Sequence, residues 1–174
     1  MRVQLAALTG VLLAAASIHA FAQNDQIERL SFDKMENFEM DKIAWKDEAL
    51  LPGAAQSALL VGDPSKPGVF MAYLKFPANY EIPAHTHPFA EVVTVLKGAA
   101  WNGMGEKLDR KKGDKLGAGS SFTLPAGHAH YLWNEEETVV LLTATGPWNI
   151  TYTNPAEDPR KQGKERMRPT AAVT

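Results

Sequence analysis

The sequence predicts a single all-β domain, a sandwich or barrel of short strands. Short apolar or alternating runs recur through the middle of the chain, and residues that favour turns separate them. No segment carries a convincing amphipathic helical pattern. The length of 174 residues fits one domain. Together these observations favour a fold built from packed sheets.

Composition narrows the possible functions. The formal net charge is −2, so the charge balance gives no indication of binding to nucleic acid or to an anionic membrane surface. The chain has no cysteine, which excludes disulfides, thiolate metal ligands and a cysteine nucleophile. An apolar fraction of 45% is ordinary for a globular core.

Residues 1–22 are predicted to be a signal peptide of the Sec type. Arg2 supplies the positive start, residues 3–18 are mostly Ala, Leu and Val, and Ala20-Phe21-Ala22 has the small-x-small pattern of a cleavage site. Cleavage after Ala22 would leave a periplasmic or secreted protein with no membrane segment. The alternative is a membrane anchor, but the apolar stretch is short and alanine-rich for a span of roughly 20 residues.

The rest of the chain divides into three predicted parts. Residues 23–49 form an N-terminal arm that could add one strand, residues 50–153 form the β domain, and residues 154–174 form a flexible tail rich in proline and charge. The predicted strands, beside the one that ends at the first histidine pair, are 56–61, 69–76, 92–96, 99–103, 122–124, 131–134, 139–145 and 148–152.

A charged segment interrupts these strands. Residues 105–117 are rich in lysine, most densely over 106–115, and such a run is usually a solvated loop. The alternative is a lid over an anionic ligand.

The first candidate site lies where one predicted strand ends and the next begins. His85 and His87 are two residues apart, so on a strand both side chains point to the same face. Pro88 ends that strand, and Glu91 begins the next, at the apolar run 92–96. Two imidazoles and a carboxylate suit a divalent transition metal. The alternative is a surface hairpin with two solvated histidines.

A second stretch supplies a further histidine. Pro125 and Gly127 frame a turn, and His130 opens the apolar run 131–133, so His130 could project into the same interior. Every histidine after the predicted signal peptide lies in one of these two stretches. His128 belongs to the second one, but the turn before it favours a place at the pocket rim or in solvent.

The two stretches resemble the paired motifs of the cupin superfamily. The first motif has the form G-x5-H-x-H-x3–4-E-x6-G, and the second has the form G-x5-P-x-G-x2-H-x3-N. The chain matches them with Asn79, His85, His87, Glu91 and Gly98, and with Gly119, Pro125, Gly127, His130 and Asn134. Asn79 replaces the first glycine, and asparagine tolerates the positive φ that such a turn needs.

The resemblance implies a double-stranded β-helix, a jelly-roll barrel similar to small single-domain RmlC-like and ChrR-like cupins. It implies that His85, His87, Glu91 and His130 bind a divalent metal, whose identity (Fe, Mn, Ni, Zn or Cu) stays open. It also implies a homodimer. Tyr80 and Trp101 are the aromatic candidates for pocket lining, with core packing as the alternative.

Three functions are compatible with such a site. A metal with one or two open positions could serve a dioxygenase acting on a small organic substrate with a chelating oxygen pair. The second possibility is a non-catalytic module that binds or senses a metal or ligand outside the cytoplasm. The third is a sugar isomerase or epimerase, although the sequence carries no sugar-specific signature. No signature supports nucleophilic catalysis by a serine and a histidine.

Overall fold

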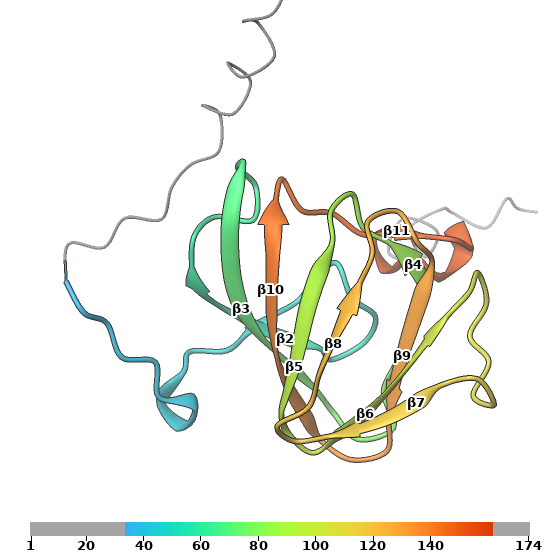
Figure 1. Ribbon diagram of the computed structural model, residues 1–174, viewed down its shortest axis with the longest axis horizontal. Helices are drawn as coiled ribbons and strands as arrows, with labels where there is room; N and C mark the ends of the chain where they lie inside the picture. The colour runs from blue at the N-terminus through green and yellow to red at the C-terminus, as the bar shows by residue number, and fades with distance from the viewer. Residues whose placement is uncertain (1–33, 162–174) are drawn as a thin grey trace, which may run out of the picture.

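The computed structural model describes residues 34–161 as two antiparallel sheets packed face to face (Figure 1). The strands are β1 (Lys46–Asp47), β2 (Gln56–Val61), β3 (Gly68–Phe76), β4 (Glu81–Thr86), β5 (Glu91–Lys97), β6 (Ala99–Met104), β7 (Asp114–Gly117), β8 (Ser121–Leu124), β9 (His130–Asn134), β10 (Thr138–Gly146) and β11 (Thr151–Tyr152). Two short 3-10 helices, η2 (Met40–Lys42) and η3 (Pro155–Glu157), flank them.

The order of the strands is that of a jelly roll. One sheet has the order β1-β2-β3-β10-β5-β8, and the other has the order β11-β4-β9-β6-β7. From β3 onward the chain therefore crosses repeatedly between the two sheets, which is the jelly-roll connection. This confirms the predicted all-β fold class. Within residues 34–161 the two sheets stay separate and do not close into one continuous barrel.

The core lies between the sheets and follows the two-residue period of the strands. Along β3, Phe70, Ala72 and Phe76 point inward and are buried. Val95 on β5 and Val140 on β10 are also buried, and they lie opposite each other in register. Full burial of a side chain of this size contributes about 1.5–3 kcal/mol. The inner faces of both sheets therefore form one apolar interior.

Two turns of the first motif have the backbone conformation that their sequence favours. Asn79 has a φ of 57°, which confirms that it takes the turn position where the motif has glycine. Gly98 has a φ of 73°, and a Cβ atom there would lie 2.5 Å from the carbonyl oxygen of Glu137. These turns determine where β4 and β6 begin.

Asn134 fastens the end of β9 to the turn before β4. Its side chain is fully buried. Its Oδ1 accepts a hydrogen bond from the backbone N–H of Tyr80 at 2.7 Å, and its Nδ2 donates to the carbonyls of Pro77 at 2.9 Å and Glu136 at 2.7 Å. The last residue of the second motif therefore positions the strand that carries His85.

Asn134→Ala is expected to lower the free energy of unfolding by about 2–4 kcal/mol, because buried backbone groups would lose their partners. Urea denaturation measures this change. The matched control is Asn154→Ala, which removes an exposed cap on the N–H of Ala156 and should cost about 0.5–1 kcal/mol. Equal, small losses in both variants would show that the Asn134 bonds do not hold this turn.

The strand predictions are largely confirmed, with two differences. Residues 148–152 were expected to form a strand, but only β11 at their end does so. Conversely, β7 lies within the lysine-rich segment that the sequence analysis interpreted as a loop. β7 pairs with β6 along one edge of the second sheet, so this pairing stabilises a strand in spite of its charged sequence.

The terminal segments are only partly described. Residues 1–22, predicted as a signal peptide, lie outside the described residues, as does the beginning of the 23–49 arm. The arm contributes β1, which pairs with β2. At the other end, Arg160 donates to the carbonyl of Ile150 at 2.9 Å, so the first residues of the predicted tail are fastened to the domain. Residues 162–174 lie outside the description, and no helix in the described part is long and apolar enough to cross a membrane.

The lysine-rich loop covers the outer face of the second sheet. Leu108 packs there against a cluster of Ala84, Tyr131 and Trp133. The guanidinium of Arg110 lies 5.9 Å from the centre of the Trp133 ring and also donates to the carboxylate of Glu81. His130 and Trp133 are three residues apart on β9, so their side chains point to opposite faces. The loop therefore packs on the outside of the sheet, on the side away from the histidines.

Candidate metal centre

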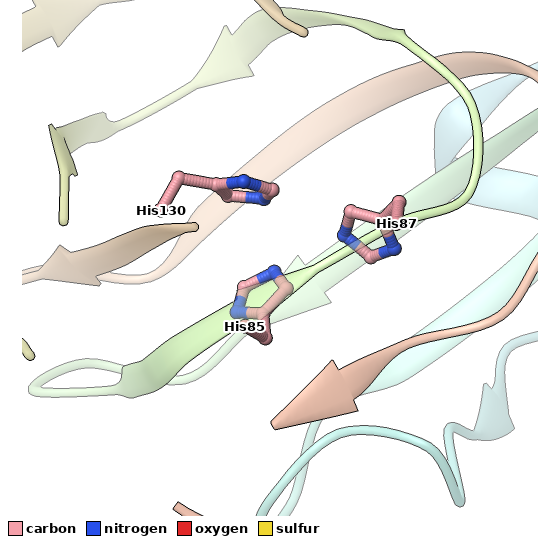
Figure 2. A group of neighbouring side chains, drawn as sticks. All are labelled: His85, His87 and His130. Carbon is pink, nitrogen blue, oxygen red and sulfur yellow. The ribbon is translucent and has the colours of Figure 1, made fainter. Parts of the chain in front are cut away.

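Three histidines meet in the interior between the sheets. His85 lies on β4 and His130 begins β9, where the two are direct partners in register. His87 follows the end of β4, and all three side chains are buried. The ring centres are 4.3 to 5.1 Å apart, and one ligand atom from each ring lies within 4.8 Å of the others (Figure 2).

Each of these rings is fixed by a hydrogen bond from its Nδ1 to a backbone carbonyl. The acceptors are the carbonyls of Pro83 for His85 (2.6 Å), Asn149 for His87 (2.8 Å) and His128 for His130 (2.9 Å). A carbonyl can only accept, so each Nδ1 carries the proton and each Nε2 keeps its lone pair. This is the usual arrangement behind a metal-ligating histidine, because it sets both the tautomer and the ring orientation.

The free nitrogens fit a divalent metal ion. The Nε2 of His130 is buried and has no hydrogen-bond partner among residues 34–161. An unsatisfied buried polar atom costs about 1–3 kcal/mol, and a metal ion at this position would remove that cost. Imidazole nitrogens suit zinc, copper, iron and nickel. The structure thus brings together the three histidines that the sequence analysis singled out.

Glu91, the fourth predicted ligand, lies in the same interior but outside the three-histidine group. It begins β5, and its side chain is buried. Its Oε1 lies 3.5 Å from Nδ1 of His87 and accepts a hydrogen bond from the indole N–H of Trp148. These contacts use Oε1 and leave Oε2 for other partners. Glu91 therefore stays a predicted ligand, held beside the histidines by Trp148.

Burial keeps the imidazoles neutral. It lowers the pKa of His87 to about 4, and it also lowers the pKa values of His85 and His130. Burial has the opposite effect on a carboxyl group and raises the pKa of Glu91 to about 7, although the Trp148 hydrogen bond lowers it in part. Metals bind the neutral form of imidazole, so at neutral pH the histidines need not release a proton when a metal binds.

The metal-free protein is expected to lose stability as the pH falls from 6.5 towards about 4. The first value is the ordinary pKa of a histidine, and the second is the pKa of His87 in the folded protein. The unfolded chain binds more protons than the folded one in this window, so the free energy of unfolding falls on acidification. Glu91 acts the other way, because its raised pKa weakens the fold as the pH rises from 4.5 to about 7. Because three histidines have lowered pKa values and only one carboxyl group has a raised one, we expect a net loss of stability on acidification.

Urea denaturation with a chelator present, at several pH values across this window, measures the effect. The same series on His87→Gln should show a shallower slope, since glutamine does not titrate. A wild-type profile that is flat below pH 6.5 would contradict the neutral-histidine arrangement.

The interior cavity at the histidines has a volume of about 50 Å³ and is lined mainly by apolar side chains. Neither Tyr80 nor Trp101, the two aromatic candidates for pocket lining, is among them. Tyr80 stacks on Phe76 with ring centres 5.1 Å apart, and its hydroxyl donates to the carbonyl of Pro52. Trp101 is paired in register with Trp133, so the two rings stack on the outer face of the sheet.

The aromatic residue at the site is Trp148, which the sequence analysis placed in a strand. Its ring stacks on His87 with centres 4.9 Å apart. The signal for this position was the Gly146-Pro147 break, because a chain that leaves its strand no longer obeys the two-residue period. His128, by contrast, is exposed to solvent, in agreement with the sequence analysis.

Comparison with known proteins agrees with the resemblance seen in the two sequence motifs. The family model described as Cupin matches residues 64–152, a range that contains both histidine stretches. A DNA damage-repair/toleration protein of Arabidopsis thaliana is 31% identical over 96 residues, which are 54% of this chain and 29% of that protein. The chain therefore spans less than a third of the length of this curated relative.

Solved structures share the fold. The polyketide cyclase RemF of Streptomyces resistomycificus matches with a TM-score of 0.60 and 17% identity, over 75% of this chain and 94% of its own. An acetylacetone dioxygenase of Acinetobacter johnsonii matches with a TM-score of 0.55 and 17% identity, over 75% and 85%. An RmlC-like cupin of Shewanella frigidimarina matches with a TM-score of 0.51 and 16% identity, over 68% and 94%. Identities this low indicate a common fold and nothing about activity.

Proposed function

Because this chain belongs to the cupin family, we propose that it binds one divalent transition metal and uses it on a small organic molecule. His85, His87 and His130 are the proposed ligands, with Glu91 as the fourth. The proposed activity is that of a metal-dependent dioxygenase on a substrate with a chelating oxygen pair.

The observation that carries the proposal is the set of three fixed, buried imidazoles. Each has its Nδ1 on a backbone carbonyl, and ligand atoms from the three lie within 4.8 Å of one another. Holding ligands in place before the metal arrives reduces the ordering that binding requires. Three nitrogens leave coordination positions for other groups, which a chelating substrate could take.

The residues around the histidines limit the chemistry that can occur. The apolar lining excludes bulk water, which strengthens electrostatic interactions inside the site. In the metal-free site burial raises the pKa of Glu91 to about 7, and a divalent cation bound beside it would favour the ionised carboxylate that binds metal. A bound metal would supply Lewis acidity or oxygen activation.

Oxygen uptake by the protein loaded with one metal at a time tests this function. Fe, Mn, Ni, Zn and Cu are the metals to compare, with acetylacetone as the first substrate because one of the structural relatives is named for it. The proposal expects uptake that requires both metal and substrate and is lost in His130→Ala. Uptake that survives removal of the metal would contradict it.

A second function is favoured by the small size of the interior. A cavity of about 50 Å³ is far smaller than the roughly 300–1,000 Å³ of sites that hold organic ligands. A non-catalytic metal-binding module would have such a site. It would bind metal stoichiometrically and show no oxygen uptake with any metal or diketone tested.

We also propose, on the sequence of residues 1–22 alone, that the chain is exported. Export in an unfolded state would make the protein take its metal outside the cytoplasm, where zinc and copper compete strongly for nitrogen ligands. Metal analysis of protein recovered from the periplasm tests this, and iron or manganese as the main metal would oppose it. A homodimer is a further proposal, and sedimentation of the purified protein measures it.

A further inference from the structure

We propose that an open groove next to the metal centre receives the apolar body of an uncharged organic ligand, whose oxygen pair then reaches the histidines past Trp148. This inference rests on the proposed function and adds to it the place and chemical class of the ligand. The groove is bounded by β2, β3 and Trp148.

The interior cavity cannot hold such a ligand by itself. Its volume is about 50 Å³, far below the roughly 300–1,000 Å³ of ordinary small-molecule sites. The oxygen pair of a chelating molecule fits this space, but its carbon body does not. The body of the ligand must therefore lie in a neighbouring space that adjoins the cavity.

The groove is such a space. It has a volume of about 280 Å³, close to the lower end of the range for small-molecule sites. Its wall is mainly apolar and includes Leu50, Leu59, Phe70, Ala72 and Leu74. Leu59 is the partner of Ala72 in register, so both point to the inner face of the first sheet. Leu59 is nevertheless 54% exposed, because this end of the inner face is not covered.

Trp148 separates the groove from the metal centre. Leu74, Leu142 and Trp148 line both spaces, so the two are neighbours with a shared wall. On one side the indole stacks on His87, and on the other it meets the ring of Phe70 edge-on at 6.1 Å. Trp148 is only half-buried, and a rotation of its side chain would join the two spaces.

The charges around the groove select against anions. Glu48 is the one charged residue that lines the groove, and no lysine, arginine or histidine lines it in the described part of the chain. Glu91 is the one acid that lines the cavity beyond Trp148. A carboxylate on the body of the ligand would face Glu48 across an apolar surface, with no cationic side chain lining the groove to offset the repulsion. An uncharged ligand avoids that cost.

The probe for this inference is 1-phenylbutane-1,3-dione, which joins an apolar ring to a chelating oxygen pair. Its binding to the nickel-loaded protein is measured by calorimetry, beside the analogue with a carboxylate on the phenyl ring. Leu59→Trp fills the groove from an exposed position. Val69→Trp is the matched control, because Val69 is 40% exposed on the opposite face of β3.

We expect Leu59→Trp to weaken binding of the probe by about tenfold or more, while Val69→Trp stays within about twofold of the wild type. The carboxylate analogue should bind at least about tenfold more weakly than the probe. Thermal melting of both variants checks that they are folded. No binding by the wild type, unchanged binding by Leu59→Trp, or equal binding of the analogue would each overturn the inference.

Nickel content, measured on the same samples, separates this inference from the proposed function. Loss of probe binding in Leu59→Trp with nickel content unchanged supports the groove. A wild type that takes up no nickel but still binds the probe, with Leu59→Trp blocking it, supports the groove and rejects the metal centre. Nickel bound normally with no probe binding rejects the groove alone.

Discussion

Replacing His130 by alanine is expected to lower the affinity for a divalent metal by at least about 100-fold. Loss of an outer-shell partner alone typically costs about 10–100-fold, and His130 is a proposed direct ligand. Its Nε2 is a buried atom without a hydrogen-bond partner in the described residues, and the one hydrogen bond lost with the ring is that from Nδ1 to the carbonyl of His128. Competition with a fluorescent chelator, using zinc and nickel in turn, measures the affinity.

His128→Ala is the matched control for this prediction. His128 is two residues away and exposed, and its Nδ1 donates to the carbonyl of Ala126 at 3.1 Å. Its backbone carbonyl, which holds His130, is kept in the alanine variant. Its metal affinity should stay within about twofold of the wild type. Equal losses in the two variants, or none in either, would contradict the proposed ligand set.

Trp148→Phe is expected to lower metal affinity by about 10–100-fold, the range seen when an outer-shell partner is removed. Phenylalanine keeps an aromatic ring against His87 but removes the indole N–H that holds Oε1 of Glu91. That hydrogen bond lowers the pKa of Glu91, so without it the carboxyl group binds its proton more tightly. The loss of affinity should therefore be larger at pH 6 than at pH 8.

Trp101→Phe provides the comparison, because Trp101 stacks on the outer face of the second sheet, away from the histidines. The same chelator competition, repeated at both pH values, should show no change for it. If Trp148→Phe binds metal as tightly as the wild type at both pH values, then Trp148 does not position Glu91 for the metal.

Sequence patterns predicted the parts of the site that depend on local structure. The two-residue period of a strand places His85 and His87 on one face, and the structure keeps their ring centres 4.8 Å apart. The pairing of His85 with His130 depends on β4 lying beside β9, and these strands are more than forty residues apart in sequence. No local pattern contains that pairing, so the resemblance to known motifs was needed to connect the two stretches.

The aromatic residues show where local reasoning fails. Trp101 was one of two candidates for pocket lining, but its pairing with Trp133 puts it on the outer face, and that register depends on two strands together. Trp148 reaches His87 only because the chain leaves its strand after Gly146 and returns to the interior. Its partner Glu91 is fifty-seven residues earlier, and such a contact follows from the topology and not from a sequence period.

X-ray absorption at the metal edge of the zinc-loaded protein tests the central claim most directly, because it counts imidazole ligands. We expect three imidazole nitrogens at about 2.0–2.1 Å from the metal, with any oxygen contributed by Glu91, water or a ligand. A spectrum with one imidazole or none would mean that the metal binds elsewhere. The three buried histidines would then be a structural feature of the core and not a metal centre.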